Sequence, residues 1–528
     1  LRMSRTFKII TGLIFWILLA GSVFIVSADR FHLFELYRKY WTILFGLFYS
    51  ILLLLFSLNK ENVSINLSIE SIFKTYVLIG VLEVAYSLLQ LLDIIPSYNR
   101  FFAYTGSFEN PALYAMFLSL CAPATLYLYY SEKNFKQLWF WLYILFASMI
   151  IMSESRTGII STLVVSLYIC YSFTEKLQVF LSKRRNQLLI VSLMAITLIA
   201  LYLFKADSAN GRLLIWRVCM DMITERPLFG FGHGGFLANY MHYQAEYLSA
   251  HPNSPFIMLA DNMNHPFNEY IKLTVEYGLI GISLAILLLY FIAKKIVRNA
   301  SATEIGLSLI VTVVIQCMFS YPFNYAVFPF LMLLLLLYVL PIKEPKPSKA
   351  YTGIRISVSA ITAMLLVYIC FSCYNNMKWA EMSKRSLRGE TEKMLPHYEQ
   401  MMSVLGHNPY FLYNYSAELN YIGLYEESNT IAELCIKRMN DYDVQLLLAD
   451  NYTNMHQYDR AIESYRTASV MVPSRFVPLE EIMDIYILQS DTAGAVQIAE
   501  EIMSKPVKVE SATVDAIKRK AEELINKY

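Results

Sequence analysis

The chain contains a series of long apolar stretches, and these constrain its fold more than any other feature. They lie at about 9–27, 41–58, 75–95, 110–130, 138–153, 157–173, 188–204, 274–292, 305–320, 325–341 and 356–374. Crossing a bilayer takes about 20 apolar residues in a helix, because the backbone groups must be satisfied within the segment. The sequence therefore predicts an all-α, polytopic membrane bundle of about 11 transmembrane helices.

The composition excludes several other classes of protein. Charged residues make up 16% of the chain, against about 25% in a typical soluble protein, which excludes a mainly soluble enzyme and a disordered chain. The net charge of +2 offers no basic excess to neutralise phosphates, so no nucleic-acid partner is expected. Seven cysteines in 528 residues do not make a disulfide framework. Cys370 and Cys373 end an apolar run and are expected to pack.

The flanking charges predict an orientation. Basic residues precede the first apolar stretch as in a signal peptide, but many more stretches follow, so we interpret it as an uncleaved first helix. With the N-terminus in the cytoplasm, most Lys and Arg of the short loops fall inside, as the positive-inside rule requires. The weakest point is 28–40, an outer loop holding Arg30, Arg38 and Lys39. This topology places the long loop 205–273 and the C-terminal region outside.

The composition changes at about residue 379, where a soluble tail begins. Residues 379–528 hold 23 acidic and 15 basic residues, a net charge of −8. Similar segments begin at Tyr425, Tyr458 and Thr492, spaced by 33 and 34 residues, and prolines recur in step. A period near 34 is typical of tetratricopeptide repeats, which stack helix pairs into an α-solenoid. The tail could serve as a docking surface for a partner or acceptor, or as a structural cap on the membrane domain.

Two polar clusters lie at the predicted outer side of the membrane, where polar groups are costly and so are functional candidates. Arg156 belongs to SESRTG, at a tight turn between two apolar stretches. Its guanidinium is a fixed fork of donors suited to phosphate oxygens; the alternatives are a snorkelling side chain or a pair with Glu154. Asn110 precedes Pro111 in TGSFENPAL and is expected to start a helix. It could line a pocket or simply form a turn.

The long outer loop carries a third cluster, GRLLIWR. Arg212 opens an amphipathic stretch, and Trp216 follows four residues later on the same helical face. Pro227 and the glycines of PLFGFGHGG then force a turn. That glycine run has no Lys-Ser/Thr after it and no strand before it, so it is neither a Walker loop nor a dinucleotide fingerprint.

The fourth cluster is HPFNEY at the end of this loop. His265 precedes Pro266, which is expected to start the helix that runs into the next span. A neutral imidazole there could accept a proton; the alternative is a capping or packing histidine. Three more histidines lie in the loop, but their spacing matches no zinc motif, so no metal site is predicted.

Four segments, taken in order, resemble the O-antigen ligase and O-antigen polymerase superfamily of bacterial membrane glycosyltransferases. They are GSFENPALYAMFL, SESRTG, GRLLIWRVCMDMITERPLFGFGHGGF and HPFNEYIKLTVEYGLIGI. The resemblance covers roughly 100–320, and the combination of HPFNEY, YMHYQAEYL and a repeat tail is similar to the Bacteroidota branch. It implies a bundle of the GT-C type in the bacterial inner membrane, with the N-terminus cytoplasmic. The expected domains are a transmembrane domain over 1–377, with 205–273 as its periplasmic catalytic loop, and a periplasmic repeat domain over 378–528.

The resemblance also implies substrates and residue roles. The donor would be a glycan on undecaprenyl pyrophosphate, and the acceptor lipid A–core, a second lipid-linked glycan or a protein hydroxyl. Arg156 and Arg212 would bind the donor pyrophosphate, Arg217 is a further candidate, and His265 would be the catalytic base. This sequence has HPF where many members have a His-Asn start, which leaves the next residues in shifted positions. The remaining pocket candidates are Asn110, Trp216, Asn268 and Glu269.

Elementary chemistry agrees with this assignment. Two arginines can stabilise the charge that gathers on a leaving pyrophosphate, and an imidazole can take the acceptor's proton. Attack opposite the leaving group inverts the anomeric carbon. No DxD-type carboxylate pair is evident in the loop, so we expect a metal-independent reaction without a cofactor.

We therefore predict an O-antigen ligase with lipid A–core as acceptor. The alternatives are an O-antigen polymerase, a protein O-oligosaccharyltransferase and, from a different class, a transporter or flippase for lipid-linked glycans. A transporter would show internal repeats among its spans and broken helices, and neither is evident in the sequence. Membrane lipids and a protein docked on the repeat domain are further expected partners.

Overall fold

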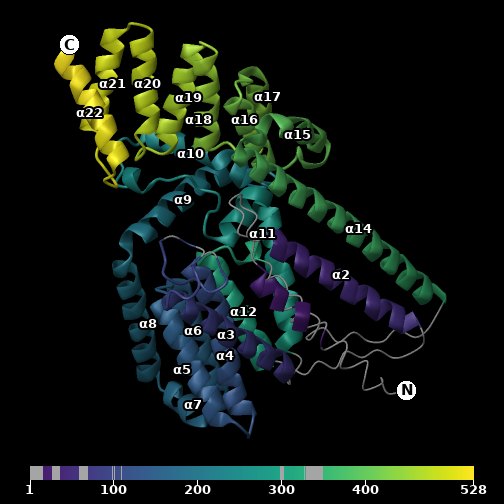
Figure 1. Cartoon of the computed structure of the whole chain (residues 1–528). Coiled ribbons are helices and arrows are strands. Elements are labelled where there is room, and N and C mark those ends of the chain that lie inside the picture. The colour runs from purple at the N-terminus through teal and green to yellow at the C-terminus, as the bar shows by residue number, and fades with distance from the viewer. Residues whose placement is uncertain are drawn as a thin grey trace. The chain divides into compact units, whose positions relative to one another are not determined.

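A computed structural model describes residues 13, 16–18, 20–25, 36–58, 69–97, 99, 101–108, 110–297, 303–325, 328 and 349–528. All regular elements within these ranges are helical, which confirms the predicted all-α class (Figure 1). The chain divides into two compact units. The first, here the membrane unit, comprises Leu1–Leu201 and Ala285–Asn376, and the second, the loop–tail unit, comprises Tyr202–Leu284 and Met377–Tyr528.

Six helices of the described chain are long and apolar enough to cross a membrane: Ile72–Leu91, Pro111–Ser131, Arg156–Phe173, Arg184–Phe204, Glu269–Val297 and Ile356–Leu405. Two shorter apolar helices, Lys136–Met152 and Gly306–Phe319, and α2 (Leu36–Leu58) coincide with three more of the predicted stretches. About half of the predicted stretch 9–27 and most of 325–341 lie outside the described residues. The chain is thus a helical membrane protein, and the number of spans stays a prediction.

Helix α4 (Pro111–Ser131) lies at the centre of the membrane unit. It packs against α3 (Ile69–Leu91), α5 (Lys136–Met152), α6 (Arg156–Phe173) and α12 (Thr303–Phe319). The residues of α4 are apolar on all sides of the helix and most of them are buried, as expected of a helix covered by its neighbours. Gln316 of α12 ties the two helices by donating to the Met116 carbonyl at 3.0 Å and to Ser119 Oγ at 2.8 Å. Asn110 caps α4, as predicted, by accepting from the Leu113 N–H at 3.1 Å.

A buried polar cluster holds the segment that precedes α4. Glu83 of α3 accepts from the Ser107 N–H at 3.0 Å and from Ser107 Oγ at 2.5 Å. Arg38 of α2 donates to the Ser107 carbonyl and to the Ile25 carbonyl, and Gln90 accepts from the Gly106 N–H at 2.9 Å. Arg38 is only 1% exposed. It is therefore a buried hydrogen-bond donor rather than a loop cation, so one of the three basic residues of 28–40 does not belong in the loop count.

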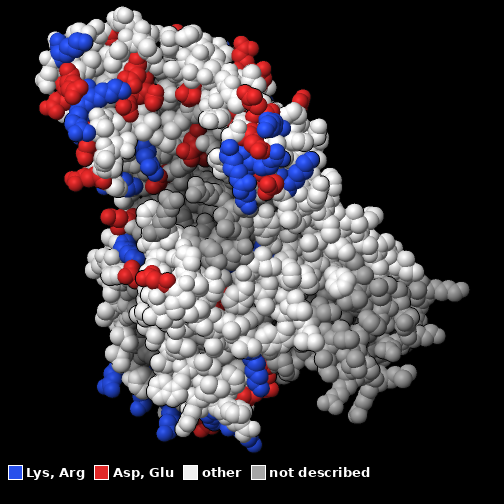
Figure 2. Space-filling view, viewed as in Figure 1, with Lys and Arg blue, Asp and Glu red and all other residues white. Residues whose placement is uncertain are grey.

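The opposite end of α4 carries a group of basic side chains. A short helix that the sequence did not indicate, α7 (Glu175–Ser182), joins α6 to α8 (Arg184–Phe204) there. Figure 2 shows Lys and Arg gathered at this end of the unit. The exposed members are Lys133, Lys136, Lys176, Lys183, Arg184 and Arg185. This is the pattern expected of a cytoplasmic face, and the orientation itself stays a prediction.

The tail forms a stack of helix pairs (Figure 1). It is preceded by α14 (Lys349–Arg385), a π-helical turn (Ser386–Glu390) and α15 (Thr391–Leu405). The pairs are α16 (Pro409–Tyr421) with α17 (Tyr425–Ile436), α18 (Tyr442–Asn454) with α19 (Tyr458–Met471) and α20 (Val477–Leu488) with α21 (Thr492–Ser504). Helix α22 (Ala512–Lys527) follows the last pair. The three segments whose spacing predicted a repeat each begin the second helix of a pair. The stacked helix pairs are confirmed, whereas the tetratricopeptide assignment stays a prediction.

The outer loop folds onto this tail rather than standing alone. It contains α9 (Ala206–Glu225), α10 (Gly235–Ala250), the short turn η1 (Ile257–Leu259) and the start of α11 (Glu269–Val297). Phe236, Tyr240 and Leu248 of α10 share a buried core with Ala468 and Met471 of α19. The sequence assigned 205–273 to the transmembrane domain; in the structure this loop lies in the compact unit that includes the tail, because α10 has an apolar face to bury.

Polar contacts fix the register of this packing. The fully buried Gln244 donates to the Met471 carbonyl at 2.7 Å and to the Asp261 carbonyl at 3.1 Å. Asn262 donates to Asp443 Oδ2 at 3.2 Å, and Arg475 lies 3.6 Å from Asp261. Since a buried amide is costly unless hydrogen-bonded, the bonds of Gln244 favour one arrangement of loop and tail, whereas the exposed contacts of Asn262 and Arg475 contribute little.

Helix α11 is interrupted at Gly278, which has φ 65° and ψ −167°. The sequence showed no broken helix, and this expectation was wrong. The freed carbonyls of Val275 and Glu276 accept from the N–H groups of Phe231 and Gly232 at 2.9 and 2.8 Å. On the far side of the break, the N–H of Leu279 donates to the Pro227 carbonyl at 2.8 Å. The turn 227–232 thus supplies the partners that the broken helix lacks.

Glycine is required on both sides of this contact. A Cβ on Gly278 would lie 2.2 Å from the Leu228 carbonyl oxygen, and one on Gly230 would lie 2.4 Å from the Val275 carbonyl oxygen. Both residues also have a positive φ, which a side chain disfavours. The interruption was invisible because Gly278 lies in a run that reads as a continuous apolar helix.

We expect Gly278→Ala to destabilise the protein by about 1–3 kcal/mol, because the new Cβ meets backbone that cannot move and φ is positive. The measurement is the midpoint of thermal unfolding of the full-length protein in detergent. Gly353→Ala is the matched control, since nothing lies within 4 Å of its Cβ position. An unchanged midpoint for Gly278→Ala would contradict the described break.

Candidate functional site

Two side chains of α9 hold the segment that contains His265. Trp216 Nε1 donates to the Pro266 carbonyl at 2.9 Å. The Arg212 guanidinium lies 5.2 Å from the centre of the Phe267 ring, a distance at which a cation is attracted to the ring face. The predicted common face of Arg212 and Trp216 is confirmed. The helix itself begins at Ala206 rather than at Arg212.

The start of α11 fixes the conformation of the same segment. The helix begins at Glu269, not at Pro266 as predicted, because Asn268 supplies the cap: its Oδ1 accepts from the Tyr270 and Ile271 N–H groups at 2.9 and 3.0 Å. Phe267 has φ 53°, so the chain turns sharply just before the cap. Asn268 thus has a capping role, and the half-buried His265 lies in the turn immediately before it.

A cavity of about 320 Å³ lies against this face of α9. Its lining residues are Asp207, Ser208, Gly211, Arg212, Leu214, Ile215, Gln244, Leu259, Ala260, Asp261, Met263, Phe267 and Lys508. Apolar walls with a few polar and charged groups are typical of a small-molecule site. The sequence had indicated only Arg212 among these residues. Lys508 could not be found from the sequence, because nothing there shows that the tail returns to the loop.

Arg217 does not share this surface. It lies five residues after Arg212, about 140° around the helix, and its guanidinium is 3.6 Å from the Asp221 carboxylate in an exposed ion pair. The structure therefore brings Arg212, Trp216 and the 265–268 segment together and leaves Arg217 on another face of α9.

The other loop histidines have neighbours of their own. His233 Nδ1 lies 3.0 Å from Tyr277 Oη, His242 lies 3.2 Å from the Glu246 carboxylate, and His251 Nδ1 lies 2.8 Å from the Tyr247 carbonyl. Within the described part of the chain, no three His, Cys, Asp or Glu side chains are grouped so that they could hold a metal ion.

The membrane unit contains the other two predicted residues. Arg156 is the first residue of α6, where Ser155 caps the helix by accepting from the Gly158 N–H at 3.2 Å. A Cβ on Gly158 would lie 3.0 Å from the Cβ of Ala115, so the first turns of α6 and α4 pack closely. Arg156 and Asn110 therefore begin neighbouring helices at one end of this unit, and the Arg156 side chain is half-buried.

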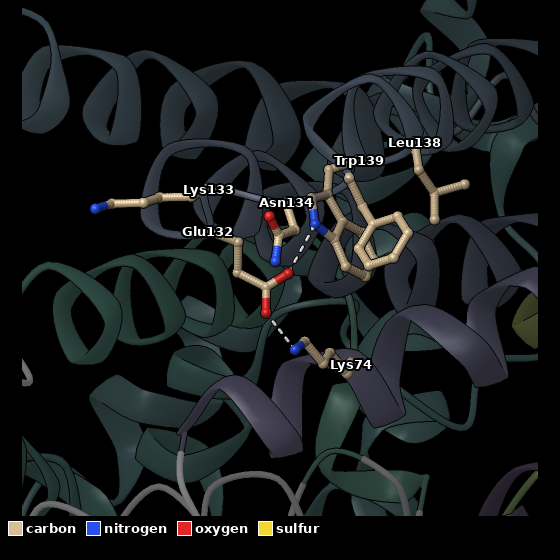
Figure 3. Close-up of a pocket in the computed structure, with 7 residues that line it drawn as sticks. Lys74, Glu132, Lys133, Asn134, Leu138 and Trp139 are labelled. Atoms are coloured by element: carbon tan, nitrogen blue, oxygen red, sulfur yellow. Dashed lines mark hydrogen bonds and ion pairs between the residues drawn. The ribbon is translucent and has the colours of Figure 1, made fainter.

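A second cavity, of about 510 Å³, lies in the membrane unit between α3 and the α4–α5 turn (Figure 3). Glu132 pairs there with Lys74 and accepts from Trp139 Nε1 at 3.0 Å. The cavity adjoins the C-terminal end of α4, about 30 Å along the helix from Asn110. None of the predicted site residues lines it, and its single carboxylate already has both partners, so we interpret it as a structural tie.

Comparison with known proteins identifies the segment that carries most of these features. Residues 141–286, which include Arg156, Arg212 and His265, match the family model described as O-antigen ligase. This segment of the chain is thus similar to the O-antigen ligase family.

Curated relatives agree with this family. The chain is 29% identical over 126 residues to a candidate polysaccharide ligase of Rickettsia conorii, and 27% identical over 99 residues to one of Rickettsia prowazekii. These matches cover 23% and 18% of this chain and 28% and 22% of the relatives, so they span about a quarter of the length of those proteins. No solved structure matches the chain.

Proposed function

We propose that this O-antigen ligase-type protein transfers a glycan from undecaprenyl pyrophosphate to an acceptor hydroxyl, with lipid A–core as the acceptor. The observation that carries the proposal is the arrangement in the loop–tail unit, where Arg212 borders a cavity and contacts the turn that holds His265. Arg212 offers a cation to a phosphate in the cavity, and His265, in the adjoining turn, is the residue that we propose for the hydroxyl. We place the reaction on the periplasmic face of the inner membrane.

The proposed reaction is a single displacement. The acceptor oxygen forms a bond to the anomeric carbon while the bond from that carbon to the pyrophosphate oxygen breaks, which inverts the carbon. His265 accepts the hydroxyl proton. Arg212 and Arg156 stabilise the charge that gathers on the departing undecaprenyl pyrophosphate, a role for which fixed guanidinium donors are well suited.

The break in α11 does not favour a transporter. Broken helices in transporters expose their half-helix ends to substrate or ions. Here the carbonyls of Val275 and Glu276 and the N–H of Leu279 are already paired with the turn 227–232. The broken helix therefore builds the outer loop rather than a binding site for cargo.

His265→Ala is expected to lower the transfer rate by about 100-fold or more, because a general base contributes about 10²–10⁴-fold. The assay measures transfer from a lipid-linked glycan by the purified protein in nanodiscs. His242→Ala is the matched control, since His242 is exposed and contacts Glu246 and Tyr243 of its own helix. Full activity of a stable His265→Ala variant would remove this residue from the mechanism.

Arg212→Lys and Arg156→Lys each keep the charge and lose the fork, so we expect the catalytic efficiency for the donor to fall by about tenfold or more. Arg184→Lys, an exposed arginine beside α7, should leave it unchanged. Steady-state kinetics with varied donor concentration measure the effect. Wild-type efficiency for both site variants would exclude forked contact with pyrophosphate.

Transfer should also survive EDTA, because the proposed mechanism assigns charge stabilisation to arginines rather than to a divalent ion. The measurement compares initial rates before and after chelation and after adding back Mg²⁺ or Mn²⁺. A rate that is lost with EDTA and restored only by one of these ions would contradict the metal-independent mechanism.

A further inference from the structure

The cavity beside Arg212 is closed in part by the tail. Lys508 lies in the segment between α21 and α22, yet it lines the same cavity as Arg212 and Phe267 of the loop. It is the only lining residue that comes from beyond residue 377. The sequence separates Lys508 from Arg212 by 296 residues (508 − 212), so only the fold brings them to one cavity.

The segment just before Lys508 is held by hydrogen bonds to its neighbours. Lys505, three residues earlier, donates through Nζ to the Arg475 carbonyl at 2.6 Å, and Lys518 of α22 donates to the Lys505 carbonyl at 3.1 Å. The Gln244–Met471 hydrogen bond and the ion pair of Arg475 with Asp261 hold the tail against the loop. The backbone beside Lys508 is therefore anchored to the same unit that builds the cavity.

The cavity lining offers both cations and carboxylates to a ligand. Its cations are Arg212 and Lys508, and its acids are Asp207 and Asp261. The Asp261 carboxylate is partly offset by Arg475, 3.6 Å away. Among the residues that the structure describes, Lys508 forms no ion pair, so its ammonium is available to a ligand. A glycosyl pyrophosphate has the matching chemistry, with phosphate oxygens for the cations and hydroxyls for the carboxylates.

We infer that Lys508 is a further cationic binding residue, beside Arg212, for the phosphate groups of the lipid-linked donor, supplied to the loop cavity by the repeat tail. The inference rests on the proposed function, because it names a further contact of the same donor site. It gives the tail a direct part in substrate binding. Lys508 is exposed, so it adds binding energy without taking part in the proton transfer.

The test uses the full-length protein in nanodiscs, with KM for the lipid-linked donor and kcat measured separately. Lys508→Ala should raise the donor KM by about 2- to 10-fold, the range for a partly solvated charge contact, and leave kcat and the unfolding midpoint unchanged. Lys508→Arg should restore KM, since it keeps the charge. Lys437→Ala, an exposed lysine of the tail after α17, is the matched control. A wild-type KM for Lys508→Ala would overturn the inference.

A second measurement identifies the group that Lys508 meets. Undecaprenyl pyrophosphate without a glycan serves as a competitive inhibitor, and its Ki should rise in Lys508→Ala by the same factor as the donor KM. A raised KM with an unchanged Ki would place the lysine on the glycan and overturn the phosphate assignment. Arg212→Ala separates the two proposals: full transfer by that variant contradicts the proposed function, whereas loss of transfer together with a wild-type Lys508→Ala contradicts only the inference.

Discussion

The hydrogen bonds between the interrupted helix α11 and the turn 227–232 are the contact on which the loop–tail unit depends. A helix that breaks inside an apolar run leaves carbonyl and N–H groups that cannot remain unpaired. The turn supplies partners at Phe231, Gly232 and Pro227. The same turn lies between the end of α9 and the start of α10, and its hydrogen bonds hold the N-terminal half of α11. Arg212 and Trp216 then meet the residues just before that helix, so the arrangement around His265 follows from a backbone requirement.

The sequence predicted the local features well, because local chemistry determines them. The helix start at Asn110 and the common face of Arg212 and Trp216 depend on residues within one or two turns of one another. The stacked helix pairs follow instead from a regular spacing of 33 and 34 residues. The sequence did not reveal the interruption at Gly278, which depends on a partner segment about 50 residues earlier (278 − 228). Its prediction that Pro266 starts α11 was wrong, because the Asn268 cap two residues later satisfies the first N–H groups instead.

Buried charge was the other feature that sequence reasoning could not place. Arg38 and Glu83 belong to segments that are far apart in the chain, and both converge on Ser107. Counting Lys and Arg in alternate loops treats every arginine near a helix end as solvated. It therefore could not distinguish the buried Arg38 from the exposed cations beside α7. Burying such groups is costly unless each has hydrogen-bond partners, and Ser107 and the Ile25 carbonyl provide them. These hydrogen bonds offset the cost of burying the two charged groups, and they hold the residues that precede the Asn110 cap of α4.

The packing of the loop on the tail bears on the role of the repeats, which the sequence left open between a docking surface and a structural cap. Ala468 and Met471 of α19 are buried against α10, and the buried Gln244 accepts from Tyr240 Oη at 2.8 Å while donating to the Met471 carbonyl. This part of the tail surface is therefore occupied by the chain itself. Removing the tail would expose the apolar face of α10 and take away the Met471 carbonyl, one of the two acceptors of the Gln244 amide. The loop with Arg212 thus relies on the tail for its own fold, and a partner could dock only on the faces that α10 leaves open.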